Sequence, residues 1–129
     1  MKILDSDHCI AILRGRLNLE DWVSPTDVLA VTAVNVAELM HGAHKSQHAA
    51  RNIAQVDVLL AAMEILPFDE QAARHFGRLK ADLERAGMPL AIADLQIAAV
   101  ALHHQVPVVT HNYRHFSRIP TLEIEDWLV

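Results

Sequence analysis

Short runs of apolar residues, many of them β-branched, recur along the chain. KILD (2–5) ends in an acid, VLAVTAV (28–34) follows a Ser-Pro-Thr-Asp cluster, and VPVVT (106–110) precedes a polar segment. Such runs are typical of buried strands. ILPFD (65–69) is expected to be a short edge strand closed by its proline, which cannot donate to a sheet, and LEIEDW (122–127) a last short strand.

Between these runs, apolar residues recur at three- and four-residue spacing, which predicts helices. Asp69 is well placed to cap the helix that runs to about Arg85, and Gly87 and Pro89 break the pattern after it. The polar segment 111–120 is predicted to be a loop. The predicted helices cover residues 9–15, 35–46, 48–64, 69–85 and 90–102.

The alternation of short strands with helices predicts an α/β fold. Parallel neighbours need helical crossovers that cover both faces, so we expect a three-layer α/β/α sandwich with a mostly parallel, short-stranded sheet. The length of 129 residues suits one domain over residues 1–129, without internal repeat or linker. In such sheets the functional site lies at the carboxyl ends of the strands.

Composition narrows the class of protein. No run approaches the roughly 18 to 20 apolar residues that span a bilayer, and early acids interrupt any signal-peptide pattern, so we expect a soluble, cytoplasmic protein with no membrane contact. The single Cys9 is expected to be a buried thiol. The net charge of −5 and pI near 5.9 argue against a protein that coats nucleic acid, but not against an enzyme that acts on it.

Four polar residues fall where strands end or where the following helices begin. Asp5 ends the first strand, Asn112 lies just after the VPVVT strand, and Glu38 and Asp94 lie in first turns of helices. Three carboxylates gathered at one edge would repel one another by about 1 kcal/mol per pair at 4 Å even in water. Oxygen ligands of this kind suit Mg²⁺ or Mn²⁺, which supports phosphodiester hydrolysis. Asp94, alone in the apolar run LAIADLQIAAVAL, most needs such a partner.

Each of these residues also has an ordinary structural interpretation. Asp5 and Asp7 are placed to cap the helix that follows them, and Asp94 to interact with a helix N-terminus. Glu38 fits an exposed helix position. The residues taken singly therefore leave the metal site and the structural roles both open.

Five segments together cover nearly the whole chain: ILDSDHCIAIL, VTAVNVAELMHGA, ILPFDEQAARHFGRL, GMPLAIADLQIAAVAL and VPVVTHNYRHFSRIPTLEIEDW. In order and spacing they resemble the PIN-domain ribonucleases, in particular the VapC toxins of bacterial toxin–antitoxin pairs. The resemblance implies a compact α/β/α sandwich and Mg²⁺- or Mn²⁺-dependent cleavage of RNA. It also implies a homodimer and inhibition by a cognate antitoxin protein whose tail covers the site.

By this resemblance Asp5, Glu38 and Asp94 are the catalytic acids, and Asp5 and Asp94 hold the metal. Asn112 falls on the fourth catalytic position, where the family often has Asp, so its contact with metal stays open. Asp7 stands where the family commonly has Asn. One negative charge is thus shifted from the fourth position to residue 7.

Other side chains near these positions have open roles. Ser6 stands where the family commonly has a hydroxyl next to the first acid. His115 is placed to meet a substrate phosphate or an antitoxin tail, or else is merely exposed. No role is assigned to the basic residues that could hold the RNA backbone, namely Arg14, Arg16, Lys45, Arg51, Arg114 and Arg118.

Two further hypotheses on function stand beside this one. His41, His44 and His48 would share a face of one uninterrupted helix and could hold Zn²⁺ or Ni²⁺, as in a metal sensor or a structural metal protein. A catalytically inactive PIN-like binding module is the other. Self-association is expected in addition, because the stretch VDVLLAAM is richer in apolar residues than a small monomer needs.

Overall fold

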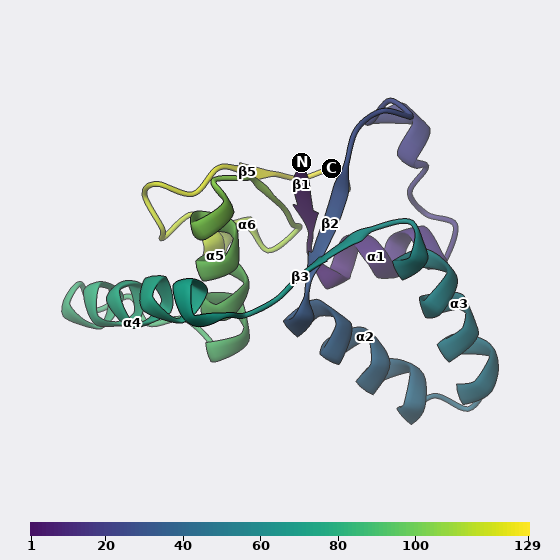
Figure 1. Cartoon of the computed structure of the whole chain (residues 1–129), viewed down its shortest axis with the longest axis horizontal. Coiled ribbons are helices and arrows are strands. Elements are labelled where there is room, and N and C mark those ends of the chain that lie inside the picture. Colours follow the sequence, from purple (N-terminus) through teal and green to yellow (C-terminus); the bar gives the residue numbers. More distant parts are fainter.

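The protein, described over residues 1–129 by a computed structural model, contains one five-stranded sheet between two layers of helices (Figure 1). The strands are β1 (Lys2–Leu4), β2 (Leu29–Thr32), β3 (Glu64–Leu66), β4 (Val108–Val109) and β5 (Ile124–Glu125). Their order in the sheet is β3-β2-β1-β4-β5, and every neighbouring pair is parallel. The predicted α/β fold with a short-stranded parallel sheet is confirmed, and ILPFD supplies an edge strand as expected.

The helices form the two outer layers. They are α1 (Ser6–Leu13), α2 (Ala33–Lys45), α3 (Ala49–Ala61), α4 (Glu70–Arg85), α5 (Ile92–His104) and α6 (Tyr113–Phe116), with a short 3₁₀ turn over Leu19–Asp21. Figure 1 shows α4, α5 and α6 on one side of the sheet and α1, α2 and α3 on the other. None of these helices has the length and apolar character needed to cross a membrane.

The core consists of two apolar clusters, one on each face of the sheet. Successive side chains of a strand point to opposite faces, so Ile3 joins the cluster beneath α4 and α5, whereas Leu4 joins the cluster beneath α1, α2 and α3. Residues of β2 and β4 divide in the same way. Cys9 is fully buried in the second cluster, as expected, and burial raises the pKa of its thiol to about 12.

The helix α2 begins earlier than the sequence pattern indicates. The strand predicted to continue to residue 34 stops at Thr32, and the helix begins at Ala33 instead of Asn35. The cause is a capping box: the Asn35 N–H donates to the Thr32 hydroxyl at 3.2 Å, and the Thr32 N–H donates to the Asn35 side chain at 2.9 Å. The β-branched threonine therefore ends the strand and caps the helix at once.

Other predicted boundaries are corrected by the structure. Helix α1 begins at Ser6 instead of residue 9, because Asp5 caps it. The helix predicted over 48–64 ends at Ala61, because Glu64 already pairs with β2 as the first residue of β3. The predicted loop 111–120 contains the four-residue helix α6, which is too short to display a helical period. The predicted helix from Asp69 to Arg85 is confirmed, with the Asp69 carboxylate accepting from the Ala72 N–H at 3.0 Å.

The histidine triplet does not lie on one helix. His41 and His44 belong to α2, but that helix ends at Lys45, and His48 lies in the turn before α3. The shared face on which the metal-sensor hypothesis depended is therefore absent, and that hypothesis is wrong in its premise. No three His, Cys, Asp or Glu side chains of the chain come together as a ready-made metal cage.

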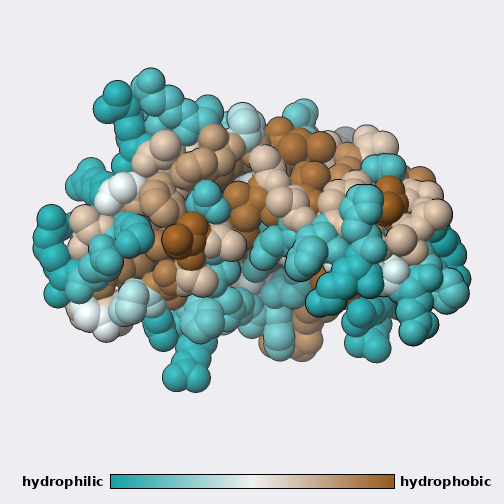
Figure 2. Space-filling view, turned by 90° about the horizontal axis from the view of Figure 1, so that it is seen from below, coloured by the Kyte–Doolittle hydropathy of each residue, from teal (hydrophilic) through white to brown (hydrophobic).

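The topology fixes where a functional site can form. Strand β1 lies at the centre, with β2 and β3 on one side and β4 and β5 on the other, so the strand order reverses between β1 and β4. In open parallel sheets, ligands bind at the carboxyl ends of the strands beside such a reversal. Asp5 follows β1 and Thr110 follows β4 at this point. Figure 2 views the molecule from this end and shows a broken band of hydrophobic residues bordered by hydrophilic ones.

Candidate functional site

Asp5 is the first residue after β1 and the N-cap of α1, and three donors fix its carboxylate. Oδ1 accepts from the Ser6 N–H at 2.8 Å and from the Asn35 amide at 3.2 Å. Oδ2 accepts from the Thr110 hydroxyl at 2.8 Å. The residue is only 7% exposed, so its orientation is set by the protein rather than by water.

The electrostatic surroundings of Asp5 disfavour its charged form. Burial raises the pKa of Asp5 to about 6, although the hydrogen bond from Thr110 opposes the rise. The negative charges of Asp7 and Glu38 add to it. The Lys and Arg ion pairs of this chain all involve other acids, so no Lys or Arg side chain neutralises this region.

Glu38 is connected to this carboxylate through the Ser6 hydroxyl and the Asn35 amide. The Ser6 hydroxyl donates to Glu38 Oε1 at 2.8 Å and accepts from the Asn35 amide at 3.1 Å. Asn35 is fully buried, and its Oδ1 accepts from the N–H and the hydroxyl of Thr32, at 2.9 and 2.8 Å. One buried amide thus ties the capping box of α2 to the start of α1, while Glu38 itself lies exposed on α2.

Asp94 lies in the first turn of α5 and faces the turn after β4. The Asn112 amide nitrogen lies 3.5 Å from Asp94 Oδ2 and donates to His115 Nδ1 at 2.8 Å, and that imidazole nitrogen is 3.7 Å from the same carboxylate oxygen. Burial raises the pKa of Asp94, His115 opposes the rise, and the charge of Asp7 adds to it. The Asn112 N–H donates to the Thr110 hydroxyl at 3.0 Å, which connects this group to the end of β4.

Asp7 also points to the turn after β4. Its Oδ2 accepts from the His111 N–H at 3.0 Å, and its Oδ1 lies 2.7 Å from His8 Nδ1. His8 is fully buried, and its Nε2 accepts from the Trp127 N–H at 3.0 Å, so the ring proton is on Nδ1 and is donated to Asp7. Burial alone would raise the pKa of Asp7, but the hydrogen bonds from His8 and from the His111 N–H outweigh it and lower the pKa.

The structure gathers the four residues singled out from the sequence, Asp5, Glu38, Asp94 and Asn112, at one edge of the sheet. They do not touch one another as a single cage, because hydroxyl and amide groups lie between them. Of the connecting groups, Ser6 was noted in the sequence, whereas Thr110 and Asn35 were missed. Thr110 and Asn35 had a local signal, since one closes a strand and the other falls three residues after a threonine, but their long-range partners had none.

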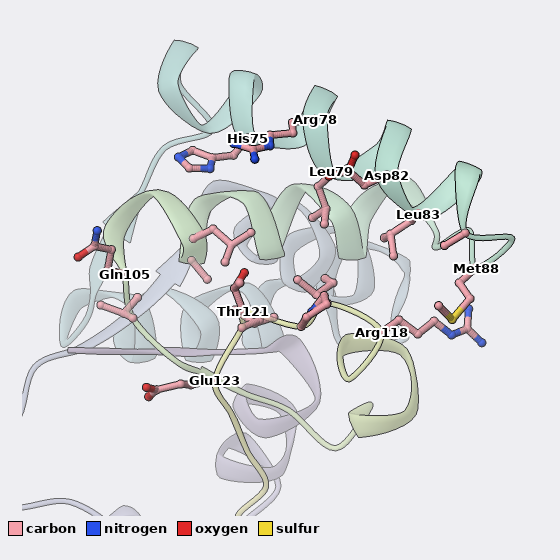
Figure 3. Close-up of a pocket in the computed structure, with 17 residues that line it drawn as sticks. His75, Arg78, Leu79, Asp82, Leu83, Met88, Gln105, Arg118, Thr121 and Glu123 are labelled. Carbon is pink, nitrogen blue, oxygen red and sulfur yellow. The ribbon is translucent and has the colours of Figure 1, made fainter.

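A cavity elsewhere on the molecule is distinct from this acidic edge. Figure 3 shows this cavity, about 690 Å³ in volume, between α4, the end of α5 and segment 118–123. Its lining on α5 begins at Ala101, whereas Asp94 lies in the first turn of that helix, and none of the acids described above lines it. The candidate site is therefore the open edge of the sheet, not this hollow.

The sequence family model for the PIN domain matches residues 2–122 of the chain. A curated relative, the tRNA(fMet)-specific endonuclease VapC of Salmonella typhimurium, is 37% identical over 132 residues, which cover 97% of this chain and 96% of the relative. Further relatives carry the name ribonuclease VapC, among them VapC2 of Rickettsia felis, which is 29% identical over 97% of this chain and 96% of the relative.

Solved structures agree with the sequence relatives. The DNA-bound VapBC of Salmonella typhimurium superposes with a TM-score of 0.91 at 36% identity, covering 98% of this chain and 97% of that one. VapBC2 of Rickettsia felis, bound to a DNA fragment from its promoter, superposes with a TM-score of 0.89 at 29% identity, covering 98% of both chains. The similarity thus extends over the whole fold, including the strand ends that carry the acids.

Proposed function

The chain belongs to the PIN-domain family and, within it, to the VapC ribonuclease toxins, and from this premise we propose that it hydrolyses RNA phosphodiester bonds with Mg²⁺ or Mn²⁺ bound at its acidic edge. The observation that carries the proposal is the cluster of carboxylates beside the strand reversal, without any Lys or Arg partner. A folded protein tolerates such a cluster when a ligand that it binds supplies the missing positive charge.

The donor set fits a hard divalent cation. Mg²⁺ and Mn²⁺ prefer oxygen ligands and keep several waters, so one or two direct carboxylates suffice and no complete protein cage is needed. Asp5 and Asp94 would hold the ion, with Glu38 close by through Ser6. Burial, with a smaller contribution from neighbouring acids, raises the pKa values of Asp5 and Asp94, and a bound cation would stabilise the charged forms that burial disfavours.

The chain's own residues have distinct tasks in this proposal. Thr110 and Asn35 hold the Asp5 carboxylate in one orientation, and Ser6 orients Glu38. When bound, the divalent ion supplies the charge that activates water and stabilises the phosphodiester oxygens. Asn112 donates toward Asp94 and therefore acts in this proposal as a positioning residue for that acid.

His115 shares the Asn112 amide and is half exposed beside it, where it is available to a substrate phosphate. The names of the relatives suggest which RNA to test as the substrate. The Salmonella relative is named for its action on tRNA(fMet), so an initiator tRNA is the first RNA to offer.

A cleavage assay tests the proposal. Purified protein is incubated with an initiator tRNA and an unrelated structured RNA, in Mn²⁺ and in EDTA, beside the variant Asp94→Asn. We expect cleavage by the wild type in Mn²⁺ only and none by the variant. Equal inactivity of both folded proteins on every RNA would favour the inactive binding module instead, and full activity of the variant would remove Asp94 from the site.

A protein antitoxin is proposed as partner, because the structural neighbours are VapBC complexes. The groove between α1 and α3, about 510 Å³ in volume, offers an apolar surface for it, with Ile12, Leu13 and Leu59 along the groove and Val58 75% exposed beside them. A homodimer is proposed as well, since exposed apolar residues of this kind are more than a small monomer needs.

The oligomeric state tests both associations. We expect light scattering to give a dimer of the chain alone and a larger complex with a cognate antitoxin. Val58→Lys should weaken at least one of these associations by about tenfold or more, because a charge would have to be desolvated in the interface. Gln71→Lys, which adds the same charge on α4, is the matched control, and a stable monomer that binds no antitoxin would contradict the proposal.

A further inference from the structure

The turn after β4 carries no negative charge of its own. Asn112, the polar residue of this turn that lies nearest Asp94, is an amide, and its NH₂ group faces Asp94 Oδ2 and His115 Nδ1. An amide in this orientation donates hydrogen bonds and adds no charge to the acidic edge. The carboxylates after β1, on α2 and on α5 therefore lack a fourth acid on the β4 side of the strand reversal.

The side chain of Asp7, which lies in the first turn of α1 on the other side of the strand reversal, contacts this turn. Its Oδ2 accepts from the His111 N–H at 3.0 Å, immediately before Asn112 in the chain, and lies 3.4 Å from the Thr110 hydroxyl. The same hydroxyl donates to Asp5 Oδ2 at 2.8 Å. A single hydroxyl thus separates the carboxylates of Asp5 and Asp7, and both lie against the turn that Asn112 belongs to.

Asp7 is held there by a buried imidazole. An acid in the first turn of a helix is often a solvated residue that only interacts with the helix dipole. Here Asp7 Oδ1 instead accepts from Nδ1 of His8, which is 0% exposed, at 2.7 Å. The opposite ring nitrogen of His8 accepts from the Trp127 N–H at 3.0 Å, so that β5 and its flank fix the ring. A solvated acid has no need of a rigid, fully buried partner.

We propose that Asp7 is the fourth acid of the metal site and supplies the negative charge that Asn112 lacks, with His8 as the positioning residue that directs it to the turn after β4. This inference rests on the proposed function, since it concerns how the same site binds its divalent cation. It assigns the charge of the site to Asp5, Asp7, Glu38 and Asp94.

Moving the charge between the two positions tests the inference. The variants are Asp7→Asn, Asn112→Asp and the double variant Asp7→Asn/Asn112→Asp, with Asp57→Asn on the exposed face of α3 as a control that removes one negative charge away from the site. Mn²⁺ affinity is measured by calorimetric titration, and the melting temperature is measured in EDTA and in Mn²⁺. Both readouts are independent of RNA cleavage.

We expect Asp7→Asn to weaken Mn²⁺ binding by about 10- to 100-fold, as for other residues that support metal ligands, and the double variant to recover most of that loss. Asp57→Asn should bind Mn²⁺ like the wild type. Asn112→Asp alone should tighten binding. A purely structural Asp7 would lower the melting temperature in EDTA but leave the Mn²⁺ increment in place, and the double variant would recover nothing.

Asp7→Ser provides a second neutral replacement if Asp7→Asn folds poorly, because the hydroxyl can still accept from His8. Wild-type Mn²⁺ affinity in Asp7→Asn or Asp7→Ser would overturn the inference. So would a double variant that binds no better than Asp7→Asn. These results leave the proposed ribonuclease intact, whereas a wild type that neither binds Mn²⁺ nor cuts RNA overturns both.

Discussion

Carboxylates of the same sheet meet opposite electrostatic surroundings at two places. At the strand reversal, Asp5 has no basic partner, and burial raises its pKa to about 6. On β5, Glu125 pairs with Lys2: its Oε1 accepts from Lys2 Nζ at 2.9 Å, and its Oε2 lies 2.7 Å from the same nitrogen. Oε1 also accepts from the Trp127 indole N–H at 3.1 Å. Burial alone would raise the pKa of Glu125, but the bonds from Lys2 and Trp127 lower it.

The difference separates an acid with a structural partner, Glu125, from acids to which the proposed function gives a ligand. Lys2 neutralises the charge of Glu125 within the chain, so this pair needs no ligand. The acids at the strand reversal are ordered by hydroxyls and amides, which fix orientation without removing charge. In the proposed function, these oriented and uncompensated acids lower the stability of the metal-free protein and make the sheet edge ready to bind a cation.

The largest expected effect that follows from this contrast is on catalysis. A divalent ion contributes several kcal/mol of transition-state stabilisation, so Asp5→Asn should lower the rate of RNA cleavage by at least about a thousandfold. Glu125→Gln, the same change of acid to amide in the compensated region, should leave the rate within about twofold. Equal loss in both variants would erase the distinction between the two regions.

The same contrast should appear in cells. Expressed alone, the wild type should arrest growth, whereas Asp5→Asn should not, at equal levels of soluble protein. Colony counts with a quantified blot measure this. If both folded forms are equally harmless, the toxin assignment fails, although a nuclease activity in the test tube could still be found.

The next effect in size is stabilisation by metal. When free Mn²⁺ exceeds its dissociation constant a thousandfold, mass action adds about 4 kcal/mol to the free energy of unfolding. Asp94→Asn should lose most of this increment, yet in EDTA it should melt at the same temperature as the wild type or higher, because one repelling charge is gone. If Asp94 were only a helix cap, Asp94→Asn would be nearly neutral with and without metal and Asp94→Ala would cost about 1 kcal/mol in both.

The dependence of stability on pH sharpens the comparison further. Asp5 has a pKa of about 6 in the folded state against 3.8 as the ordinary value, so the folded state holds this proton more tightly. Its contribution is complete below about pH 4 and is lost as the pH rises through about 6, by at most about 3 kcal/mol. Asp94, with its raised pKa, acts in the same direction, and Asp7 acts in the opposite one.

Urea unfolding in EDTA from pH 4 to 7 measures this contribution. Asp5→Asn should gain stability relative to the wild type as the pH rises, because the amide has no proton to lose. If the difference in free energy of unfolding between the two proteins does not change with pH, Asp5 is already ionised at pH 4. Its negative charge would then be compensated within the chain.

The sheet, and the edge of it at which the acids lie, could be predicted from the sequence because both depend on local pattern. A buried run that ends in Asp5 marks a strand end, and the cap at Asp69 marks a helix start. What connects the acids is not local. Thr110 donates to Asp5 and Trp127 donates to His8 between residues that are 105 and 119 positions apart in the sequence, and no periodicity in the chain predicts such pairs.

Boundaries were missed where one residue serves two elements. In the sequence Thr32 belongs to a run rich in β-branched residues, yet in the structure its hydroxyl caps the start of α2. Helix α6, four residues long, is held by the tertiary fold instead of its own pattern, since Phe116 is fully buried in the core. The same limit applies to Asp7: as a first-turn acid it has an ordinary capping interpretation, and only the contact with the turn after β4 supports its proposed role in the metal site.

The smallest expected effect belongs to the compensated region. Lys2→Met removes the pair with Glu125, whose side chains are 37% and 36% exposed, and the cation–π contact of Lys2 Nζ, 5.7 Å above the Trp127 ring. Exposed pairs contribute little, so the cost at pH 7 should be below about 1 kcal/mol.

Because the pKa of Glu125 is lowered, this contribution is present above its ordinary pKa of 4.5 and is lost as the pH falls, opposite in sign to that of Asp5. Urea unfolding of Lys2→Met at pH 7 and pH 3 measures it, with cleavage of RNA as a second readout that should not change. Trp127 also donates its N–H to His8, so a loss of cleavage in Lys2→Met would mean that β5 controls the position of Asp7, and the two regions would no longer be independent.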